Sequence, residues 1–155
     1  YYPDMQRCTC TSAAINRYLR KISRPLLDRI DICVEVPPIG FKDLYNTGKS
    51  ERSEEIRKRV IRTQEIQKMR YCGEEFCFNS HIPSSKIFEY CKLDKKQETY
   101  MERMYNKLDL TARTYHKILR VARTLADMEE SEQIKMRHLN EAICYRNIDK
   151  KFWEV

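Results

Sequence analysis

The sequence predicts a mainly α-helical protein, in which a short helix and one strand precede a bundle of four or five helices. Only 3 of the 155 residues are glycine, whereas 34% are charged, a balance more typical of soluble helical proteins than of sheet sandwiches. Apolar residues recur at helical spacing in most segments after residue 53, and they alternate with polar residues in a strand-like run only over residues 30–36. The 41% of apolar residues is sufficient for a core.

The first 38 residues contain the predicted short helix and the predicted strand. Thr11 or Ser12 can cap a helix over residues 13–21, which ends before Pro25. In residues 30–36, isoleucine and valine alternate with Asp, Cys and Glu, so one face of this strand is apolar. A lone strand leaves both of its edges unpaired. We therefore expect its sheet partners to precede residue 1, and the missing start methionine agrees with a chain cut from a longer protein.

After a predicted loop over residues 39–52, the apolar spacing becomes helical. Helices are predicted over residues 53–69, after Pro83, over 94–108 with Asp94 at the start, over 112–126 with Thr111 as the cap, and over 135–146. The helix after Thr111 has the strongest pattern, because its apolar residues keep the 3–4 spacing for four turns. Residues 71–82 break the helical pattern.

The composition of the chain limits where the protein can be located and which partners it can bind. No apolar run approaches the roughly 20 residues that span a bilayer, and the N-terminus lacks the apolar centre of a signal peptide. The seven cysteines lack the spacing of a secreted scaffold, which indicates reduced thiols in the cytoplasm. The net charge of +7 permits contact with nucleic acid or nucleotide phosphates but does not demonstrate it.

Three stretches carry a resemblance to a known family. They are YYPDMQRCTCT (residues 1–11), SRPLLDRIDICVEVP (23–37) and LTARTYHKILRVARTLADMEESEQIKMRHLNEAICYR (110–146). Together they resemble the C-terminal third of the magnesium-chelatase-like AAA+ ATPases of the ComM and YifB kind. The resemblance implies that residues 1–38 are the C-terminal remnant of an AAA+ α/β core, a helix followed by the last core strand. Residues 39–52 would then be the loop that connects this core to a helical lid, residues 53–155.

The resemblance also implies an activity and an assembly for a longer protein. Such ATPases work as rings, with a homohexamer expected here, and they bind ATP and Mg²⁺ between subunits. Their phosphate-binding loop and Mg²⁺-binding acidic motif would lie upstream of Tyr1. The 155 residues alone should then bind no cofactor tightly and hydrolyse no ATP.

Arg29 is the first candidate site residue. From the residues alone, it can form a surface ion pair with Asp28 or Asp31. The resemblance implies instead that Arg29 is the arginine finger, which reaches the γ-phosphate on the neighbouring subunit, with Asp28 and Asp31 as supports. A planar, always-charged guanidinium suits the charge that builds on a transferring phosphoryl group. Arg24 stands where the family usually has glycine, so which arginine has the role stays open.

Arg113 is the second candidate, because it follows the Thr111 cap by two residues. A helix N-terminus presents free N–H groups and partial positive charge, to which an arginine adds further donors for an anion. The resemblance implies that Arg113 is the sensor 2 residue, which touches the nucleotide phosphates. Arg120 and Arg123 lie on the same predicted helix and are alternatives, although an Arg123–Asp127 salt bridge would account for Arg123.

Two cysteine clusters are candidate metal sites. Cys8 and Cys10 form a C-x-C pair, and the resemblance implies a second such pair upstream, so that four thiolates could hold a structural Zn²⁺ in the longer protein. Here only half of that site would be present, and we expect no metal bound to this chain. Cys72, Cys77 and His81 are an incomplete ligand set, which indicates a loop with incidental thiols.

Nucleic acid is a further expected partner. The resemblance extends to helicases and to DNA branch migration in transformation and recombination, so single- or double-stranded DNA is expected as the motor's substrate. Cations available for phosphate contacts in this chain are Arg52, Arg57, Lys58, Arg59, Arg62, Lys68 and Arg70. No aromatic residues of the stacking kind alternate with them. The alternatives are a non-catalytic helical adaptor, which binds nucleic acid or protein through its basic face, and a chelatase subunit for Mg²⁺ insertion.

Overall fold

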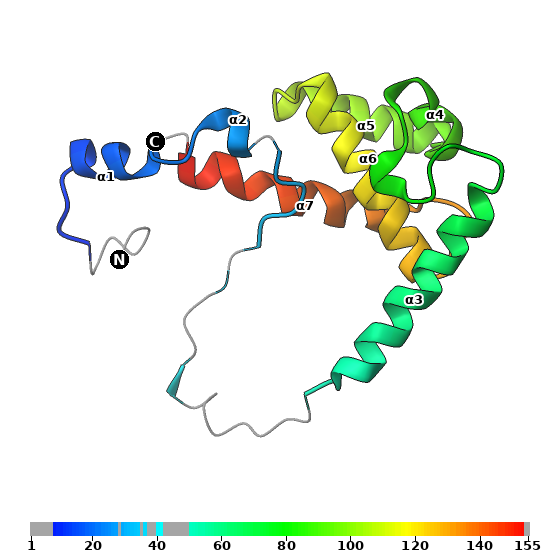
Figure 1. Cartoon of the computed structure of the whole chain (residues 1–155). Coiled ribbons are helices and arrows are strands. Elements are labelled where there is room, and N and C mark those ends of the chain that lie inside the picture. Colours follow the sequence, from blue (N-terminus) through cyan, green and yellow to red (C-terminus); the bar gives the residue numbers. More distant parts are fainter. Residues whose placement is uncertain (1–7, 28, 35, 37–39, 42–49, 154–155) are drawn as a thin grey trace. The chain divides into compact units, whose positions relative to one another are not determined.

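A computed structural model describes residues 8–27, 29–34, 36, 40–41 and 50–153 of the chain (Figure 1). The chain divides into two compact units. The first unit comprises residues 1–35 and 143–155, and the second comprises residues 36–142. The predicted mainly α-helical class is confirmed.

The first unit begins with the predicted short helix. Helix α1, Ser12–Leu19, starts after Thr11, whose Oγ1 accepts a hydrogen bond from the Ala14 amide at 3.3 Å. This bond satisfies one of the amides that have no partner in the first turn of a helix. Ile15 and Leu19 are the buried residues of α1. A second short helix, α2, covers Arg24–Leu27.

The predicted strand over residues 30–36 is not formed in the described part of the chain. Residues 30–34 have no strand assignment, and Ile32 and Val34 are exposed. A strand needs a neighbouring strand for its hydrogen-bond ladder, and the described residues supply none. Instead, the Cys33 amide donates to the carbonyl oxygen of Tyr145 at 3.0 Å. The prediction of a strand over residues 30–36 is therefore wrong for the residues that the structure describes in this range.

The second unit contains the predicted helical bundle. Its elements are α3 (Ser53–Arg70), the 3₁₀ turns η2 (Asn79–His81) and η3 (Ser84–Lys86), α4 (Ile87–Tyr90), α5 (Lys95–Lys107), α6 (Ala112–Met128) and the first part of α7 (Met136–Trp153). Figure 1 shows α6 in the middle of this unit, with α3, α4 and α5 around it. Each helix that the spacing predicted is confirmed within a few residues at its ends, except that the last helix continues to Trp153 instead of ending at residue 146.

The core of the second unit gathers around α6. Ile118, Leu119, Ala122 and Ala126 on α6 are fully buried. Residues of the neighbouring elements are buried with them: Ile82, Ile87, Cys91, Met101 and Leu139. Because α6 is buried on most sides, its first turn and the cap at Thr111 are held in a fixed helix. Arg113 therefore lies in the first turn of a capped helix whose later turns are buried in the bundle.

A buried polar cluster joins α3 to α6. Asp127 has no exposed side-chain area and accepts from both Nη atoms of Arg70, from Nε of Arg123 at 3.1 Å and from the amide of Asn79 at 2.8 Å. Gln67 accepts from the backbone amide of Asn79, which ties η2 to α3. The predicted Arg123–Asp127 ion pair is confirmed at 3.0 Å. A buried carboxylate is tolerated because several donors replace the water it has lost.

The two arginines of this cluster respond differently to their surroundings. Burial opposes the charge of Arg70, but the hydrogen bond and negative charge of Asp127 outweigh it and raise the pKa of Arg70. For Arg123, burial dominates over the attraction of Asp127 and lowers the pKa. Both guanidiniums stay charged at neutral pH, because the ordinary pKa of arginine lies far above it.

None of the helices in the described ranges combines the length and the low charge that a bilayer span requires.

Candidate nucleotide-contacting arginines

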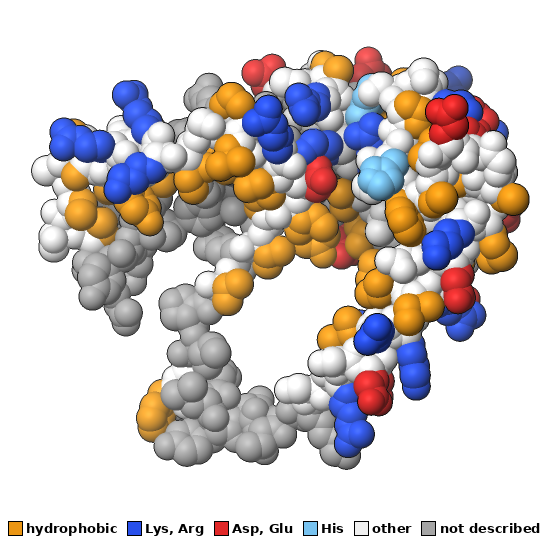
Figure 2. Space-filling view, in the orientation of Figure 1, with side chains coloured by type: hydrophobic (Ala, Val, Ile, Leu, Met, Phe, Trp, Pro, Cys, Tyr) orange, Lys and Arg blue, Asp and Glu red, His pale blue; other side chains and the backbone are white. Residues whose placement is uncertain are grey.

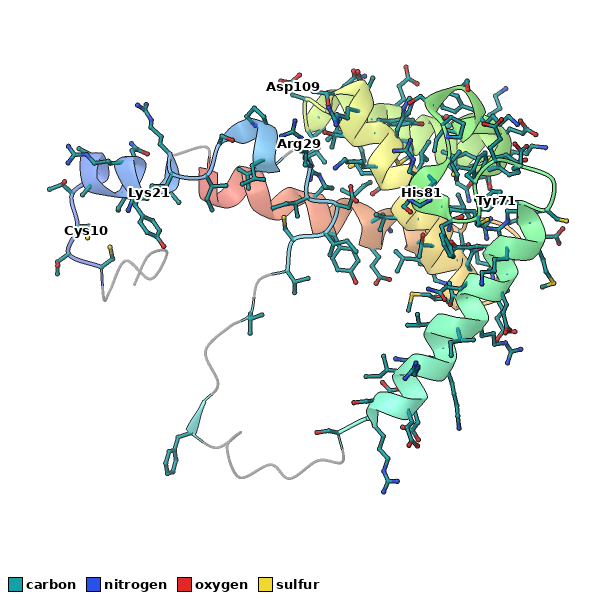
Figure 3. The ribbon with its side chains drawn as sticks, viewed as in Figure 1. Cys10, Lys21, Arg29, Tyr71, His81 and Asp109 are labelled. Carbon is teal, nitrogen blue, oxygen red and sulfur yellow. The ribbon has the colours of Figure 1, made fainter. Side chains whose placement is uncertain are left out.

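Arg29 lies in the turn that follows α2 in the first unit. Its backbone amide donates to the carbonyl oxygen of Leu26, and the Ile30 amide donates to that of Leu27, each at 3.0 Å. The side chain is exposed, and none of the ion pairs among the described residues involves its guanidinium. Figure 3 labels Arg29 on the segment beyond α2. Its donors are therefore available to an anion from outside the unit.

The predicted supports of Arg29 are only partly described. Asp31 is exposed in the same segment, and Asp28 lies outside the described residues. Arg24, the competing arginine, begins α2, but its side chain also lies outside the described part. The surface pairing of Arg29 with Asp31 is not among the ion pairs that the described residues form.

Arg146 of α7 holds the turn that carries Arg29. Its Nη1 donates to the carbonyl oxygens of Leu27, at 3.3 Å, and of Ile30, two residues before and one residue after Arg29. Arg146 is buried. Sequence reasoning assigned it no role. The available signal was its position three and seven residues after Ile143 and Leu139, on the apolar side of the last helix.

Arg113 lies in the first turn of α6, in the second unit. Thr111 is the N-cap as predicted, because its Oγ1 accepts from the Thr114 amide at 3.2 Å. The Arg113 side chain is exposed, and it takes part in none of the ion pairs within the described ranges. The guanidinium thus lies beside a helix N-terminus, and both features favour an anion.

The other two arginines of α6 are engaged within the bundle. Arg120 Nη2 donates to the carbonyl oxygen of Ile82 at 2.6 Å. Arg123 donates to the carbonyl oxygens of Glu132 and Ser131, at 2.8 and 2.6 Å, as well as to Asp127. These contacts hold loops against α6, so both side chains have structural tasks.

The predicted cysteine clusters, Cys8 with Cys10 and Cys72 with Cys77 and His81, lie within the described residues. The pKa of Cys10 is raised chiefly by a hydrogen bond with Cys8, so the two side chains lie next to each other. Among the described residues, no group of three or more His, Cys, Asp or Glu side chains could hold a metal ion. Cys72, Cys77 and His81, the last of which is labelled in Figure 3, therefore form no such group.

Comparison with known proteins identifies the family. The model of the family described as magnesium chelatase, subunit ChlI C-terminal, matches residues 50–146, which include α3 to α6 and most of the described bundle. This chain belongs to the magnesium chelatase family. A second model, magnesium chelatase, subunit ChlI, matches residues 1–44, which include the turn of Arg29.

The similarity of the chain to curated proteins agrees with its assignment to the magnesium chelatase family. It is 42% identical over 133 residues to the competence protein ComM of Haemophilus influenzae, an alignment that covers 85% of the chain and 25% of the relative. It is 36% identical to YifB of Salmonella typhimurium and 34% identical to YifB of Escherichia coli, each over 143 residues, 91% of the chain and 27% of the relative. The chain thus spans about a quarter of the length of these relatives.

Proposed function

We propose that this chain is the arginine-finger and lid portion of a ring-forming AAA+ ATPase, in which Arg29 acts on a nucleotide bound by the neighbouring subunit. The observation that carries the proposal is the exposed Arg29 guanidinium on a turn that the buried Arg146 fixes from both sides. The family match over residues 1–44 supports it. Residues 1–38 would complete the core, residues 39–52 would connect, and residues 53–155 would form the lid.

The chemistry expected of Arg29 is electrostatic. ATP with Mg²⁺, bound by the longer protein, would supply the phosphoryl group that is transferred to water. Arg29 would place a delocalised positive charge and several N–H donors against the charge that develops during that transfer, a contribution of about 10³–10⁵ in rate in well-studied systems. Fixed donors are effective because they need no reorganisation during the reaction. The hydrogen bonds from Arg146 provide this fixation for the backbone, and Asp28 and Asp31 would orient the side chain.

Arg113 is proposed as the sensor 2 residue, which contacts the phosphates from the lid. Its exposed side chain at the N-terminus of α6 supports this role, because the helix end and the guanidinium attract the same anion. The engagement of Arg120 and Arg123 within the bundle also supports Arg113 over these two alternatives. Contact between Arg113 and the phosphates would then couple the position of α6 to the bound nucleotide.

We propose a cytoplasmic homohexameric ring that acts on single- or double-stranded DNA as a helicase or branch-migration motor, for which the net charge of +7 is the support within this chain. Cys8 and Cys10, which lie next to each other, would provide half of a structural Zn²⁺ site.

A test uses subunit mixing in a longer protein that contains this chain. Arg29→Ala should abolish most ATP turnover and leave ATP binding intact, and Arg29→Lys should restore little because a point charge lacks the planar donors. Arg113→Ala should also lower turnover. Mixing the two inactive variants should recover activity, because some interfaces then combine an intact Arg29 with an intact Arg113.

Two outcomes would reject this role. Unchanged turnover in Arg29→Ala would make the Arg29 turn a surface feature and favour the non-catalytic adaptor. Lost turnover without recovery on mixing would mean that one subunit supplies both arginines of a nucleotide site, and it would contradict the proposed division between neighbouring subunits. Arg17→Ala is the matched control, because Arg17 is an exposed arginine of the same unit with no proposed role.

A further inference from the structure

An open groove with apolar borders lies between α3 and α6 in the second unit. It has a volume of about 290 Å³, and its apolar lining residues are Val60, Phe78 and Met128. Val60 on α3 and Met128 on α6 are 46% and 48% exposed, so both helices contribute apolar side chains that the bundle leaves uncovered. Figure 2 shows hydrophobic side chains uncovered along α3, beside basic ones.

Three polar side chains of the groove are already bonded within the chain. Thr63 and Thr124 each donate their hydroxyl to the backbone carbonyl oxygen four residues earlier, at 2.8 and 2.9 Å. The side-chain oxygen of Gln67 accepts from the backbone amide of Asn79 at 3.1 Å. Because these groups already have partners, an apolar side chain can enter the groove without leaving them unpaired.

The apolar surface of the groove continues along α3 beyond Val60. Ile56 lies one turn before Val60 and is also exposed, whereas Thr63 and Gln67 of the same stripe are buried. The bundle therefore covers the second half of this stripe and leaves the first half open. From Ile56 to Gln67 the stripe is about 16 Å long, which corresponds to about three turns of a partner helix.

Two exposed cations follow the edge of the groove. Arg57, Gln64 and Lys68 lie along one line of α3, at intervals of seven and four residues, and Gln64 is itself a lining residue. No ion pair among the described residues involves Arg57 or Lys68. Glu54 and Glu65 each lie three residues before one of these cations, on the side of the helix away from the groove. The charge at the edge of the groove is therefore positive.

We propose that this groove binds an acidic amphipathic helix of a partner protein, with its apolar face on Val60 and Met128 and its carboxylates on Arg57 and Lys68. An amphipathic helix in an apolar groove is a recurring mode of peptide recognition, and opposite charges at the edge fix its register. Arg57 and Lys68 lie about 16 Å apart along the axis of α3. The partner's carboxylates should therefore be eleven positions apart on one face of its helix, with apolar residues between them.

This inference goes beyond the proposed ATPase function and does not depend on it, so binding is measured with the 155-residue chain and without nucleotide. The probe is a fluorescently labelled helical peptide with two glutamates eleven positions apart and with leucines between them at intervals of three and four residues. Fluorescence anisotropy should show that this peptide binds more tightly than two others, one with lysines for the glutamates and one with serines for the leucines. Absence of binding up to about 1 mM of the glutamate peptide, the weak end of specific affinities, would reject the proposal.

Two kinds of variant give different expected signatures. Val60→Ser and Met128→Ser should each weaken binding of the glutamate peptide by more than about 5-fold, because each removes an apolar contact at the centre of the interface. Arg57→Glu/Lys68→Glu should cost up to about 5-fold for each lost ion pair. The same double variant should bind the lysine peptide more tightly than the glutamate peptide, because the charge at the edge of the groove is reversed.

Matched controls come from the opposite side of the same helix. Met69 and Lys58 lie nine residues after and two residues before Val60, positions about half a turn away from it around α3, and both are exposed. Met69→Ser should leave the affinity for the glutamate peptide unchanged, and Lys58→Glu should change it less than Arg57→Glu does. Thermal unfolding of each variant verifies that the fold is retained.

Several results would overturn the proposal. Equal losses in Met69→Ser and Val60→Ser, or equal affinity for the glutamate and lysine peptides, would mean that the groove does not recognise the probe. Self-association of the unmodified chain in sedimentation that Val60→Ser abolishes would make a second copy of this chain the occupant. Tighter binding to phosphatidylserine vesicles than to the peptide, lost in the same variants, would make it a lipid surface.

Discussion

Arg146 donates from Nη1 to the carbonyl oxygen of Leu27 across a separation of 119 residues in sequence. The same nitrogen donates to the carbonyl oxygen of Ile30, so one buried guanidinium bonds to the backbone on both sides of Arg29. A buried carbonyl group needs such a partner, because leaving it unpaired costs about 1–3 kcal/mol. The position of the turn thus depends on α7.

The first prediction concerns Arg146 as a positioning residue. In the longer protein, Arg146→Lys should lower ATP turnover but not ATP binding, because lysine cannot bond to both carbonyl groups with the planar geometry of arginine. Arg29→Ala made in the Arg146→Lys background should then cost less than it does alone, since the two changes act on one feature. Hydrogen exchange at the Arg29 amide should be faster in Arg146→Lys. Normal turnover together with faster exchange would show that Arg146 only stabilises the unit.

The second prediction compares a buried ion pair with an exposed one. Asp127→Ala should reduce the free energy of unfolding by about 3–5 kcal/mol, because it leaves the buried Arg123 and the half-buried Arg70 without their carboxylate. Glu130→Ala removes the exposed partner of Arg62 and should cost about 0–1 kcal/mol. Urea unfolding followed by circular dichroism measures both.

The comparison depends on burial, which differs sharply between the two pairs. The side chains of Arg123 and Asp127 are 4% and 0% exposed, whereas those of Arg62 and Glu130 are 67% and 49% exposed. Similar losses in Asp127→Ala and Glu130→Ala would mean that the cluster around Asp127 contributes no more than a surface pair. Asp127→Asn should lie between the two, since an amide oxygen still accepts but carries no charge.

Local sequence signals predicted the helices well because capping and apolar spacing are themselves local. Thr11 and Thr111 cap their helices as their positions indicated. Asp94 forms a capping box with Gln97, in which each side chain accepts from the backbone amide of the other residue, at 2.8 and 2.9 Å. These interactions involve residues three apart, so a short window of sequence contains all of their partners.

Features that depend on distant residues could not be predicted in this way. Ile56 and Val60 share one helical stripe of α3 with Thr63 and Gln67, yet the two apolar residues are exposed and the two polar residues are buried. Gln67 is buried because it accepts from Asn79, twelve residues away, which no helical pattern indicates. The strand over residues 30–36 failed for the same reason, since strand pairing is a non-local property.

The candidate site shows the same division. Arg29 and Arg113 were singled out from their motif and from the Thr111 cap, but their roles came from the family resemblance. That both side chains are exposed, and that Arg146 bonds to the turn of Arg29, could be learned only from the three-dimensional structure. Arg123 was explained in advance because its partner Asp127 is one helical turn away.

The third prediction concerns the cap of α6. Thr111→Ala should lower the free energy of unfolding by about 0.5–2 kcal/mol, because the Thr114 amide loses its acceptor. Thr111→Ser keeps the hydroxyl and should recover most of this loss. In the longer protein, fraying of the first turn should also weaken ATP binding through Arg113. An unchanged nucleotide affinity in Thr111→Ala would argue against contact between Arg113 and the phosphates.

The fourth prediction concerns alkaline pH. The hydroxyl of Tyr90 donates to Glu74 at 2.6 Å, and this hydrogen bond to a carboxylate, more than burial, raises the pKa of Tyr90 to about 12 from an ordinary value of 10.0. Because the folded pKa is the higher one, the contribution of the neutral hydroxyl to stability is complete below pH 10.0. It is lost as the pH rises from there towards about 12.

Ultraviolet titration of tyrosinate measures this directly. The difference between the titration curves of the unmodified chain and Tyr90→Phe should show one tyrosine that ionises near the raised pKa, about 12. Glu74→Gln should return that tyrosine towards its ordinary pKa, and it should also lower the pKa of Lys86, which the same carboxylate raises. Stability near pH 11, measured by urea unfolding, should change more between Glu74→Gln and the unmodified chain than between Glu89→Gln and the unmodified chain. A difference curve centred at an ordinary tyrosine pKa would show that the Tyr90–Glu74 hydrogen bond does not persist in solution.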